Sequence, residues 1–435
     1  MINMEKNAEL LKILISDVRP ALGCTGPLEV IYAAAAAARA VGGELESISM
    51  ILDRDTYKNC ISVATPGTDY MGVTEAAVLG ALYGNPDLGL EVLRDLGEYD
   101  AEFVETFAKE KVDVKIRWDL KMMAIYTEVF VNTSNGTGHV IVARTHDGVV
   151  LKEANGKVLY KDESYSPESL TFEAEKPIRK FTVKDIYDFA VSVPAEDIAF
   201  LAEAIKKNCE LAEAGLKENT GSNFGLGFSK IGDGSGYSRA KMLAAAASDA
   251  RMSGVALPAM SCGGSGNVGI TGCVPLVCMA EELGSGEEEL HRALAMSYLL
   301  IILVKAHIGR LSPLCACALA ASIGVTAGTT YLMGGDFDRI EGAISSLVGS
   351  IGGVLCDGAK FGCAMKLATG AGVAIDCAKL AMEGINIRQL DGLVGTSAQE
   401  TIELVGRLAS RGMLKADEDM CREIIRREGV ISADE

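Results

Sequence analysis

Five cysteines occupy positions where thiolate chemistry is possible. Cys356 and Cys363 lie in VLCDGAKFGCAMK, Cys315 and Cys317 in LSPLCACALAAS, and Cys24 in LGCTGPLEV. Three thiolates that converge on an apolar, Gly/Ala-rich region are one way in which a chain holds an iron–sulfur cluster. Three ligands leave one iron open to a substrate, and a further cysteine at a helix start can supply a thiolate base. The pattern therefore indicates metal-assisted elimination on a small polar molecule.

Cys24 lies where a helix is expected to begin. Thr25 or Gly26 can cap this helix, and Pro27 suits its first turn, where a missing N–H costs nothing. The positive end of the helix dipole favours a thiolate over a thiol. The alternative is a structural cysteine buried at a helix junction, and the spacing alone gives the two interpretations equal weight.

The glycine-rich segment SCGGSGNVGITGCVP at 261–275 is a second candidate. Such a loop can place several backbone N–H groups around a carboxylate or a phosphate. It is not a P-loop, because no G-K-[ST] ends it, and its composition alone favours a tight helix–helix junction. Arg310 precedes the Cys315/Cys317 pair and can clamp a carboxylate. Nothing marks Lys360 or Lys366 as a Schiff-base lysine, so pyridoxal phosphate is not expected.

Size and composition narrow the class of protein. The 435 residues are 49% apolar and 23% charged, as in globular proteins, and suffice for two or three domains. A net charge of −18 argues against nucleic acid and anionic membranes as partners. The twelve cysteines, without an expected signal peptide, point to a reducing, cytoplasmic compartment. Zinc is disfavoured because no C-x-x-C occurs.

Periodicity predicts an α+β fold in three parts. Residues 1–43 are expected to form N-terminal helices that pack with the catalytic domain. Residues 44–177 contain alternating segments such as ESISMILD, VDVKIRWD and AIYTEVFVNT with Asn-Gly and Asp-Gly turns, which predict a mixed α/β domain with an antiparallel sheet. Residues 178–435 lack strand signals and predict an all-α, cluster-binding catalytic domain into which the α/β domain is inserted.

Four segments together resemble one known family. GCTGP, SCGGSGNVGITGCVPLV, LSPLCACALAASIG and GVLCDGAKFGCAMK occur in the same order as in the L-cysteine desulfidase branch of the iron–sulfur-dependent L-serine dehydratase alpha-chain family. The resemblance covers nearly the whole chain. It implies a [4Fe–4S] cluster on three cysteines, no pyridoxal phosphate, and conversion of a β-substituted L-amino acid to pyruvate and ammonia.

The resemblance also implies roles for single residues. Cys356 and Cys363 match two cluster ligands, and the third falls in the LCAC pair, where Cys315 needs a smaller shift than Cys317. Cys24 corresponds to the catalytic base of the desulfidases and stands where the serine dehydratases have a histidine. Substrate binding is expected at the residues of two backbone segments, Thr25, Gly26, Gly263, Gly264, Ser265 and Asn267.

We therefore expect a lyase that converts L-cysteine to pyruvate, ammonia and hydrogen sulfide. L-serine dehydration by the same chemistry is the first alternative. A non-enzymatic iron–sulfur sensor is the second, although no DNA-binding motif or basic patch supports it. The expected partner is a small-molecule amino acid, not nucleic acid or a membrane, and the expected assembly is a homo-oligomer.

Overall fold

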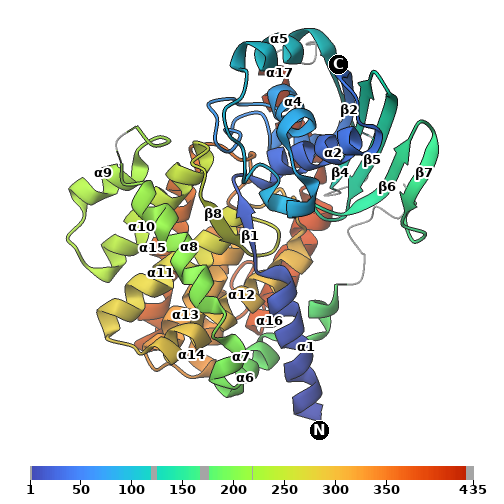
Figure 1. Cartoon of the computed structure of the whole chain (residues 1–435). Coiled ribbons are helices and arrows are strands. Elements are labelled where there is room, and N and C mark those ends of the chain that lie inside the picture. Colours follow the sequence, from blue (N-terminus) through green and yellow to red (C-terminus); the bar gives the residue numbers. More distant parts are fainter. Residues whose placement is uncertain (1, 119–124, 167–175, 218, 428–435) are drawn as a thin grey trace.

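The computed structural model describes residues 2–118, 125–166, 176–217 and 219–427. A sheet-containing part lies above a larger helical part in Figure 1. The predicted α+β fold is confirmed, since a six-stranded sheet and a two-stranded sheet stand beside many helices. Residues 167–175, which precede the expected domain boundary at 177, lie outside the described residues.

The larger sheet has the strand order β3-β2-β4-β5-β6-β7. Its strands coincide with the predicted alternating segments: β2 (Leu45–Asp53), β3 (Val112–Arg117), β4 (Tyr126–Thr133), β5 (Gly136–Ala143), β6 (Val149–Ala154) and β7 (Lys157–Lys161). Neighbouring strands from β2 to β7 run antiparallel, as predicted, but β3 pairs with β2 in parallel. A parallel pair needs a long crossover, and here it consists of α3 (Arg54–Lys58), α4 (Thr74–Tyr83), η1 (Pro86–Glu91) and α5 (Ala101–Lys111).

The second N-terminal helix packs on this sheet. Helix α2 (Thr25–Val41) places Val30, Ala33 and Ala37 in one core with residues of β4 and β5. A Cβ on Gly138 of β5 would lie 2.0 Å from the carbonyl oxygen of Ala37, so glycine is needed for this close approach. The packing of α2 differs from the expectation for residues 1–43, because an alanine-rich helix that is apolar on all sides does not reveal which neighbour it will contact. Helix α1 (Ile2–Asp17) does contact the helical part.

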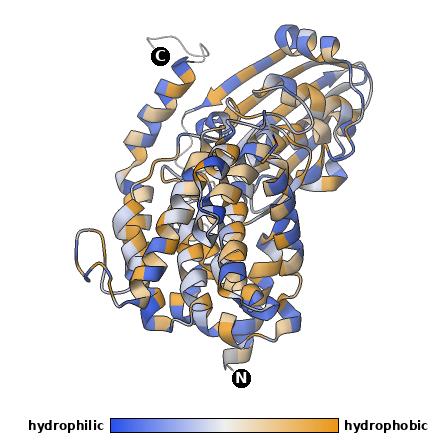
Figure 2. Cartoon of the chain, turned by 90° about the vertical axis from the view of Figure 1, so that its left-hand side faces the viewer, coloured by the Kyte–Doolittle hydropathy of each residue, from blue (hydrophilic) through white to orange (hydrophobic). Residues whose placement is uncertain are grey.

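The helical part is built around one long apolar helix, α12 (Glu287–Ile308). By length and composition α12 could span a membrane, but 89% of its apolar window is buried inside the protein. It is therefore the core helix of this part. Figure 2 shows that many helices of the molecule carry alternating hydrophilic and hydrophobic bands. The other described helices between residues 177 and 407 are η3 (Pro177–Lys180), α6 (Val183–Ser192), α7 (Ala195–Ile198), α8 (Leu201–Ala214), α9 (Phe224–Ile231), α10 (Gly236–Met252), α11 (Gly266–Leu283), α13 (Ala320–Leu332), α14 (Phe337–Ile351), α15 (Cys363–Met382) and α16 (Ala398–Arg407).

Two connections hold the two parts together. The short strands β1 (Arg19–Leu22) and β8 (Pro258–Ser261) pair antiparallel, although neither segment was expected to be a strand. After the π-turn Leu408–Gly412, the last helix, α17 (Leu414–Arg427), crosses back to the sheet-containing part. There the ammonium of Lys58 lies 3.0 Å from the carboxylates of both Asp55 and Asp417. Chain segments from both ends of the sequence therefore meet at the junction.

Candidate active site

One pocket is lined by residues of both parts. From the sheet-containing part come the N-terminus of α2, the end of α3 and the loop between β5 and β6. From the helical part come the ends of α10 and α12, the start of α11, and the segments around Cys315 and Cys356. The pocket therefore depends on how the two parts are joined.

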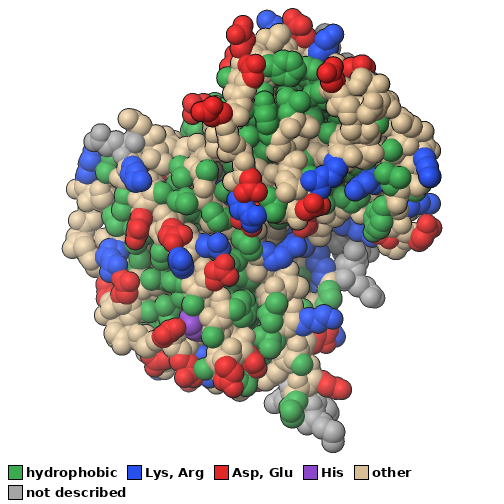
Figure 3. All heavy atoms as spheres, in the orientation of Figure 1, with side chains coloured by type: hydrophobic (Ala, Val, Ile, Leu, Met, Phe, Trp, Pro, Cys, Tyr) green, Lys and Arg blue, Asp and Glu red, His purple; other side chains and the backbone are tan. Residues whose placement is uncertain are grey.

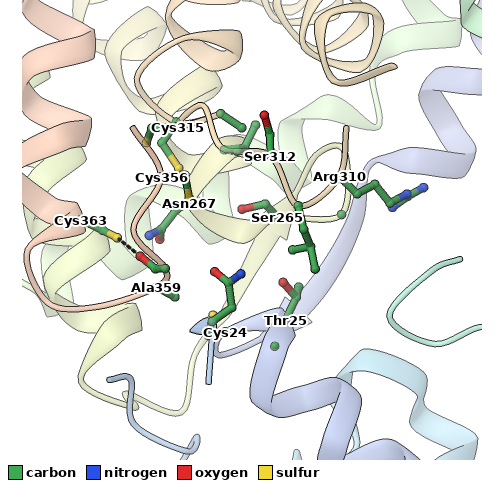
Figure 4. A pocket seen from close by; sticks show the side chains of 18 of the residues that line it. Cys24, Thr25, Ser265, Asn267, Arg310, Ser312, Cys315, Cys356, Ala359 and Cys363 are labelled. Atoms are coloured by element: carbon green, nitrogen blue, oxygen red, sulfur yellow. Dashed lines mark hydrogen bonds between the residues drawn. The ribbon is translucent and has the colours of Figure 1, made fainter. Parts of the chain in front are cut away.

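Cys315 and Cys356 are brought together by a short antiparallel ladder. The N–H of Cys315 donates to the carbonyl of Val354 and that of Cys356 to the carbonyl of Pro313, both at 2.8 Å. These bonds flank the bridge pair Leu314–Leu355. Side chains alternate along such a ladder, so both cysteines lie on the face opposite the leucines. Figure 4 shows their side chains next to each other.

Cys363 joins them from the first residue of α15. Its thiol donates to the carbonyl of Gly358 at 3.7 Å. Gly358 has φ +91°, and a Cβ there would lie 2.5 Å from the carbonyl oxygen of Lys58. The Nζ of Lys366 donates to the carbonyl of Leu355 at 2.8 Å and also pairs with Asp357. The loop between the two cysteines is thus fixed at both ends, against α3 and against α15.

Cys317 lines the same pocket as Cys315, Cys356 and Cys363. A hydrogen bond from the Cys317 thiol lowers the pKa of Cys315 to about 6, and the same bond and burial raise the pKa of Cys317. The structure thus brings both members of the predicted pair to the site. The choice of Cys315 over Cys317 as the ligand stays a prediction.

The sulfurs of the described pocket cysteines are not grouped as tightly as the ligands of one metal ion. Within the described residues, no three pocket cysteines have all their sulfurs within 4.8 Å of one another. Ligand sulfurs of one tetrahedral zinc ion lie about 4 Å apart, whereas the irons of a cluster separate their ligands further. One other group does satisfy this limit, Asp55, Asp417 and Cys421. The ammonium of Lys58 already offsets the negative charge of this group, so we do not assign a metal ion to it.

The glycine-rich turn before α11 lets three cations approach the pocket. Gly263 and Gly264 have φ +60° and +74°, which glycine adopts without strain. A Cβ on Gly263 would lie within 2.5 Å of the Lys305 side chain, and one on Gly264 within 2.5 Å of the Arg310 side chain. A Cβ on Gly266 would likewise lie within 2.5 Å of the side chain of Arg251. The glycines of this segment therefore make room for positive charge.

Two of these cations are almost fully buried. Arg251 is 2% exposed, and its Nη1 donates to Asn267 Oδ1 at 3.1 Å. Its Nε and Nη2 are buried without a hydrogen-bond partner within the described part of the chain. Lys305 is 4% exposed, and burial together with Arg310 lowers its pKa to about 8. The buried cationic side chains of Arg251 and Lys305 are therefore suited to binding an anionic ligand.

The whole pocket is positively polarised. The lining cations are Lys58, Arg251, Lys305, Arg310 and Lys366, and no described lining residue is Asp or Glu. The N-termini of α2, α11 and α15 add three helix dipoles with their positive ends at the pocket. Figure 3 shows Lys and Arg side chains gathered where the two parts meet. This excess of positive charge in an acidic protein fits a thiolate-ligated cluster and a carboxylate ligand.

The pocket contains nearly all of the residues expected from the sequence. Cys24 is 5% exposed, precedes the first turn of α2, and lies across the pocket from the other cysteines in Figure 4. Thr25, Gly26, Gly264, Ser265 and Asn267 also line the pocket. Gly263 does not line it and lies behind the turn, against Lys305.

Several lining residues were missed by the sequence analysis. They include Lys58, Asn59, His146, Arg251, Lys305 and Ser312. Lys58 and His146 belong to the sheet-containing part, where nothing in the alternating pattern marked them. Lys305 and Arg251 sit near the C-terminal ends of apolar helices, where a cation is equally expected as a partner of the helix dipole. Neither cation therefore carries a local signal of a role in the pocket.

Comparison with known proteins agrees with this geometry. The sequence profile of the serine dehydratase alpha chain matches residues 88–422. A UPF0597 protein of Caldanaerobacter subterraneus is 40% identical over 410 residues, which cover 94% of this chain and 96% of that protein. A UPF0597 protein of Clostridium tetani is 36% identical over 416 residues, covering 95% and 97%. The chain therefore belongs to the iron–sulfur serine dehydratase alpha-chain family.

Proposed function

We propose that this protein is a pyridoxal-phosphate-independent [4Fe–4S] lyase that converts L-cysteine and water to pyruvate, ammonia and hydrogen sulfide. The observation that carries the proposal is the meeting of Cys24 with Cys315, Cys356 and Cys363 in one pocket, none of whose described lining residues is acidic. Three of these thiols supply the cluster ligands, and the fourth stays available as a base. Family membership supports a lyase.

Cysteine thiolates are the ligands that iron–sulfur clusters prefer. Cys315, Cys356 and Cys363 would hold the cluster, and Lys58 and Lys366 would offset the negative charge of their thiolates. When bound, the cluster supplies an open iron that acts as a Lewis acid on the β-substituent.

Cys24 is suited to the removal of the α-proton. It stands at the N-terminus of α2, and its side chain makes no capping hydrogen bond to the helix. As a thiolate, Cys24 would accept the proton from Cα. Loss of the β-substituent then gives aminoacrylate, which tautomerises and hydrolyses to pyruvate and ammonia.

The cationic side of the pocket would hold the α-carboxylate. Arg251, Lys305 and Arg310 surround the turn at 263–266, whose backbone N–H groups begin α11. Arg251 and Lys305 have lost most of their water, so a carboxylate would recover interactions that burial removed. The subsite would fix the substrate relative to Cys24.

L-serine dehydration is the second candidate, favoured by the family to which the chain belongs. Both substrates present the same carboxylate and amine, so the β-substituent must decide between them. A soft thiolate suits iron better than a hydroxyl group does. The resemblance places a histidine of the serine dehydratases at the position of Cys24. This difference also favours L-cysteine over L-serine as the substrate.

The test is anaerobic reconstitution with iron and sulfide, followed by assays with both amino acids. We expect cluster absorption, sulfide and pyruvate from L-cysteine, and a lower kcat/KM for L-serine. Cys356→Ala should lose iron, whereas Cys377→Ala, on the same helix as Cys363 but outside the pocket, should keep it. A cluster-loaded protein that turns over neither amino acid would leave the sensor alternative.

A further inference from the structure

The loop between β5 and β6 carries a histidine into the pocket. His146 lies in the turn at 144–148, lines the pocket and is 4% exposed. The neighbouring carboxylate of Asp147 pairs with Arg19 at 3.2 Å, which ties the turn to β1. The histidine is therefore held at the junction of the two parts, on a tight and anchored turn.

A buried hydrogen-bond chain fixes the imidazole. Its Nδ1 lies 2.7 Å from Oε2 of Glu29, a fully buried residue of α2. The other oxygen, Oε1, accepts a hydrogen bond from the hydroxyl of Thr127 at 2.5 Å. Thr127 on β4 is itself fully buried. Both carboxyl oxygens of Glu29 thus have a hydrogen-bond partner. Helix α2 therefore places Cys24 at the pocket and, through Glu29, also orients His146.

The free edge of the ring faces the substrate side. Because Nδ1 points to Glu29, the opposite edge, with Cδ2 and Nε2, points away from α2. Cδ2 would lie 3.6 Å from a Cβ on Gly264, and Nη1 of Arg310 would lie 2.5 Å from the same point. His146 and Arg310 therefore flank the glycine turn that begins α11.

Burial favours the neutral form of both members of the pair. Burial, followed by Arg310 and Lys305, lowers the pKa of His146 to about 3. Burial raises the pKa of Glu29 well above its usual range, against the opposing effect of the Thr127 hydrogen bond. A protonated Glu29 donates to Nδ1, so the single N–H proton of the neutral ring is on Nε2.

We propose that His146 is a neutral hydrogen-bond donor, through Nε2–H, to the α-carboxylate of the substrate, and that Glu29 and Thr127 are positioning residues for it. This inference rests on the proposed function and extends it to a residue of the sheet-containing part. It also gives Glu29 of the LGCTGPLEV segment a role.

The Nε2–H donor of His146 would stabilise the carboxylate most while the α-proton is being transferred. The Cα–H bond breaks, the proton goes to Sγ of Cys24, and the electron pair delocalises into the carboxylate before the β-substituent leaves. The Nε2–H bond does not break, because a neutral imidazole is a very weak acid. It can therefore stabilise growing negative charge without losing its proton.

The first test compares three variants by kcat, KM and L-alanine affinity. L-alanine has the same carboxylate and amine but no leaving group, so its binding can be measured without turnover. His146→Leu should weaken L-alanine binding and lower kcat/KM, each by about 10- to 100-fold, with unchanged iron content. His146→Gln restores a donor of similar reach and should recover part of this loss. His139→Leu, a control on β5 whose ring also contacts two carboxylates outside the pocket, should match the wild type.

The second test examines Glu29. Glu29→Gln can still donate to Nδ1, so it should lose much less activity than Glu29→Leu, which cannot. An equally large loss in both Glu29 variants would overturn the assignment of the proton to Nε2. Unchanged L-alanine affinity and kcat/KM in His146→Leu would overturn the role of His146 while leaving the lyase intact. Conversely, a wild type that binds L-alanine but turns over no substrate would refute the proposed function and not the subsite.

Discussion

Gly358 is the residue on which the position of the cluster-ligand segment should depend most. It combines φ +91° with a Cβ position only 2.5 Å from the backbone carbonyl oxygen of Lys58. A left-handed backbone costs a non-glycine residue about 1–2 kcal/mol. Overpacking against a backbone atom, which cannot rotate away, adds about 1–3 kcal/mol. Gly358→Ala should therefore destabilise the protein by about 2–5 kcal/mol.

Two matched glycines separate these effects. Gly384→Ala has φ +74° but no atom within 4 Å, so it should show the backbone cost alone. Gly353→Ala has neither a positive φ nor a close atom and should be nearly neutral. With about 2.1 cal/mol/K per residue of unfolding entropy, the 435 residues give roughly 0.9 kcal/mol/K for cooperative unfolding. Gly358→Ala should then lower Tm by about 2–5 °C and Gly384→Ala by about 1–2 °C.

The assay is thermal unfolding by circular dichroism, together with the iron content after anaerobic reconstitution. We expect Gly358→Ala to bind less iron than either control, because the loop between Cys356 and Cys363 must move away from Lys58. If Gly358→Ala loses no more stability than Gly384→Ala and keeps its iron, the contact with Lys58 does not hold the ligand segment.

Other changes should affect single steps. Cys24→Ala should keep cluster absorption and lose α-proton exchange, measured as deuterium entering L-alanine or L-cysteine from D₂O; loss of iron would instead make Cys24 a ligand. Lys305→Met should raise KM at least about 10-fold, since it removes a charged partner of the carboxylate. In the wild type, Lys305 is charged below its pKa of about 8, so KM should rise as pH increases through that value, and this step should vanish in the variant. The same substitution should raise Tm at neutral pH, because the native state holds the Lys305 proton less tightly than the unfolded chain does. An unchanged KM together with an unchanged Tm would show that this ammonium neither binds substrate nor opposes folding.

Local signals explain why most strands were predicted correctly. Segments such as Tyr126–Thr133 alternate apolar and polar residues, and the Asn-Gly pair at 155–156 occupies the hairpin turn between β6 and β7. Such patterns are read within a few residues and depend little on the rest of the chain. The strands Arg19–Leu22 and Pro258–Ser261 were missed because each is four residues long and pairs only with the other.

For the site, local features of the sequence identify the chemical types of the residues. These features are the thiols of Cys356 and Cys363 with the two glycines between them, the helix start beside Cys24, and the glycines before α11. The family resemblance predicts that these residues lie in one pocket. Tertiary contacts between the two parts bring them there. Lys58, His146 and Lys305 reach the pocket only because α3, the β5–β6 turn and α12 converge there. A cation or histidine in an ordinary helix or turn carries no local mark of its distant partners, so only the packing of the two parts could decide the charge and donors of this site.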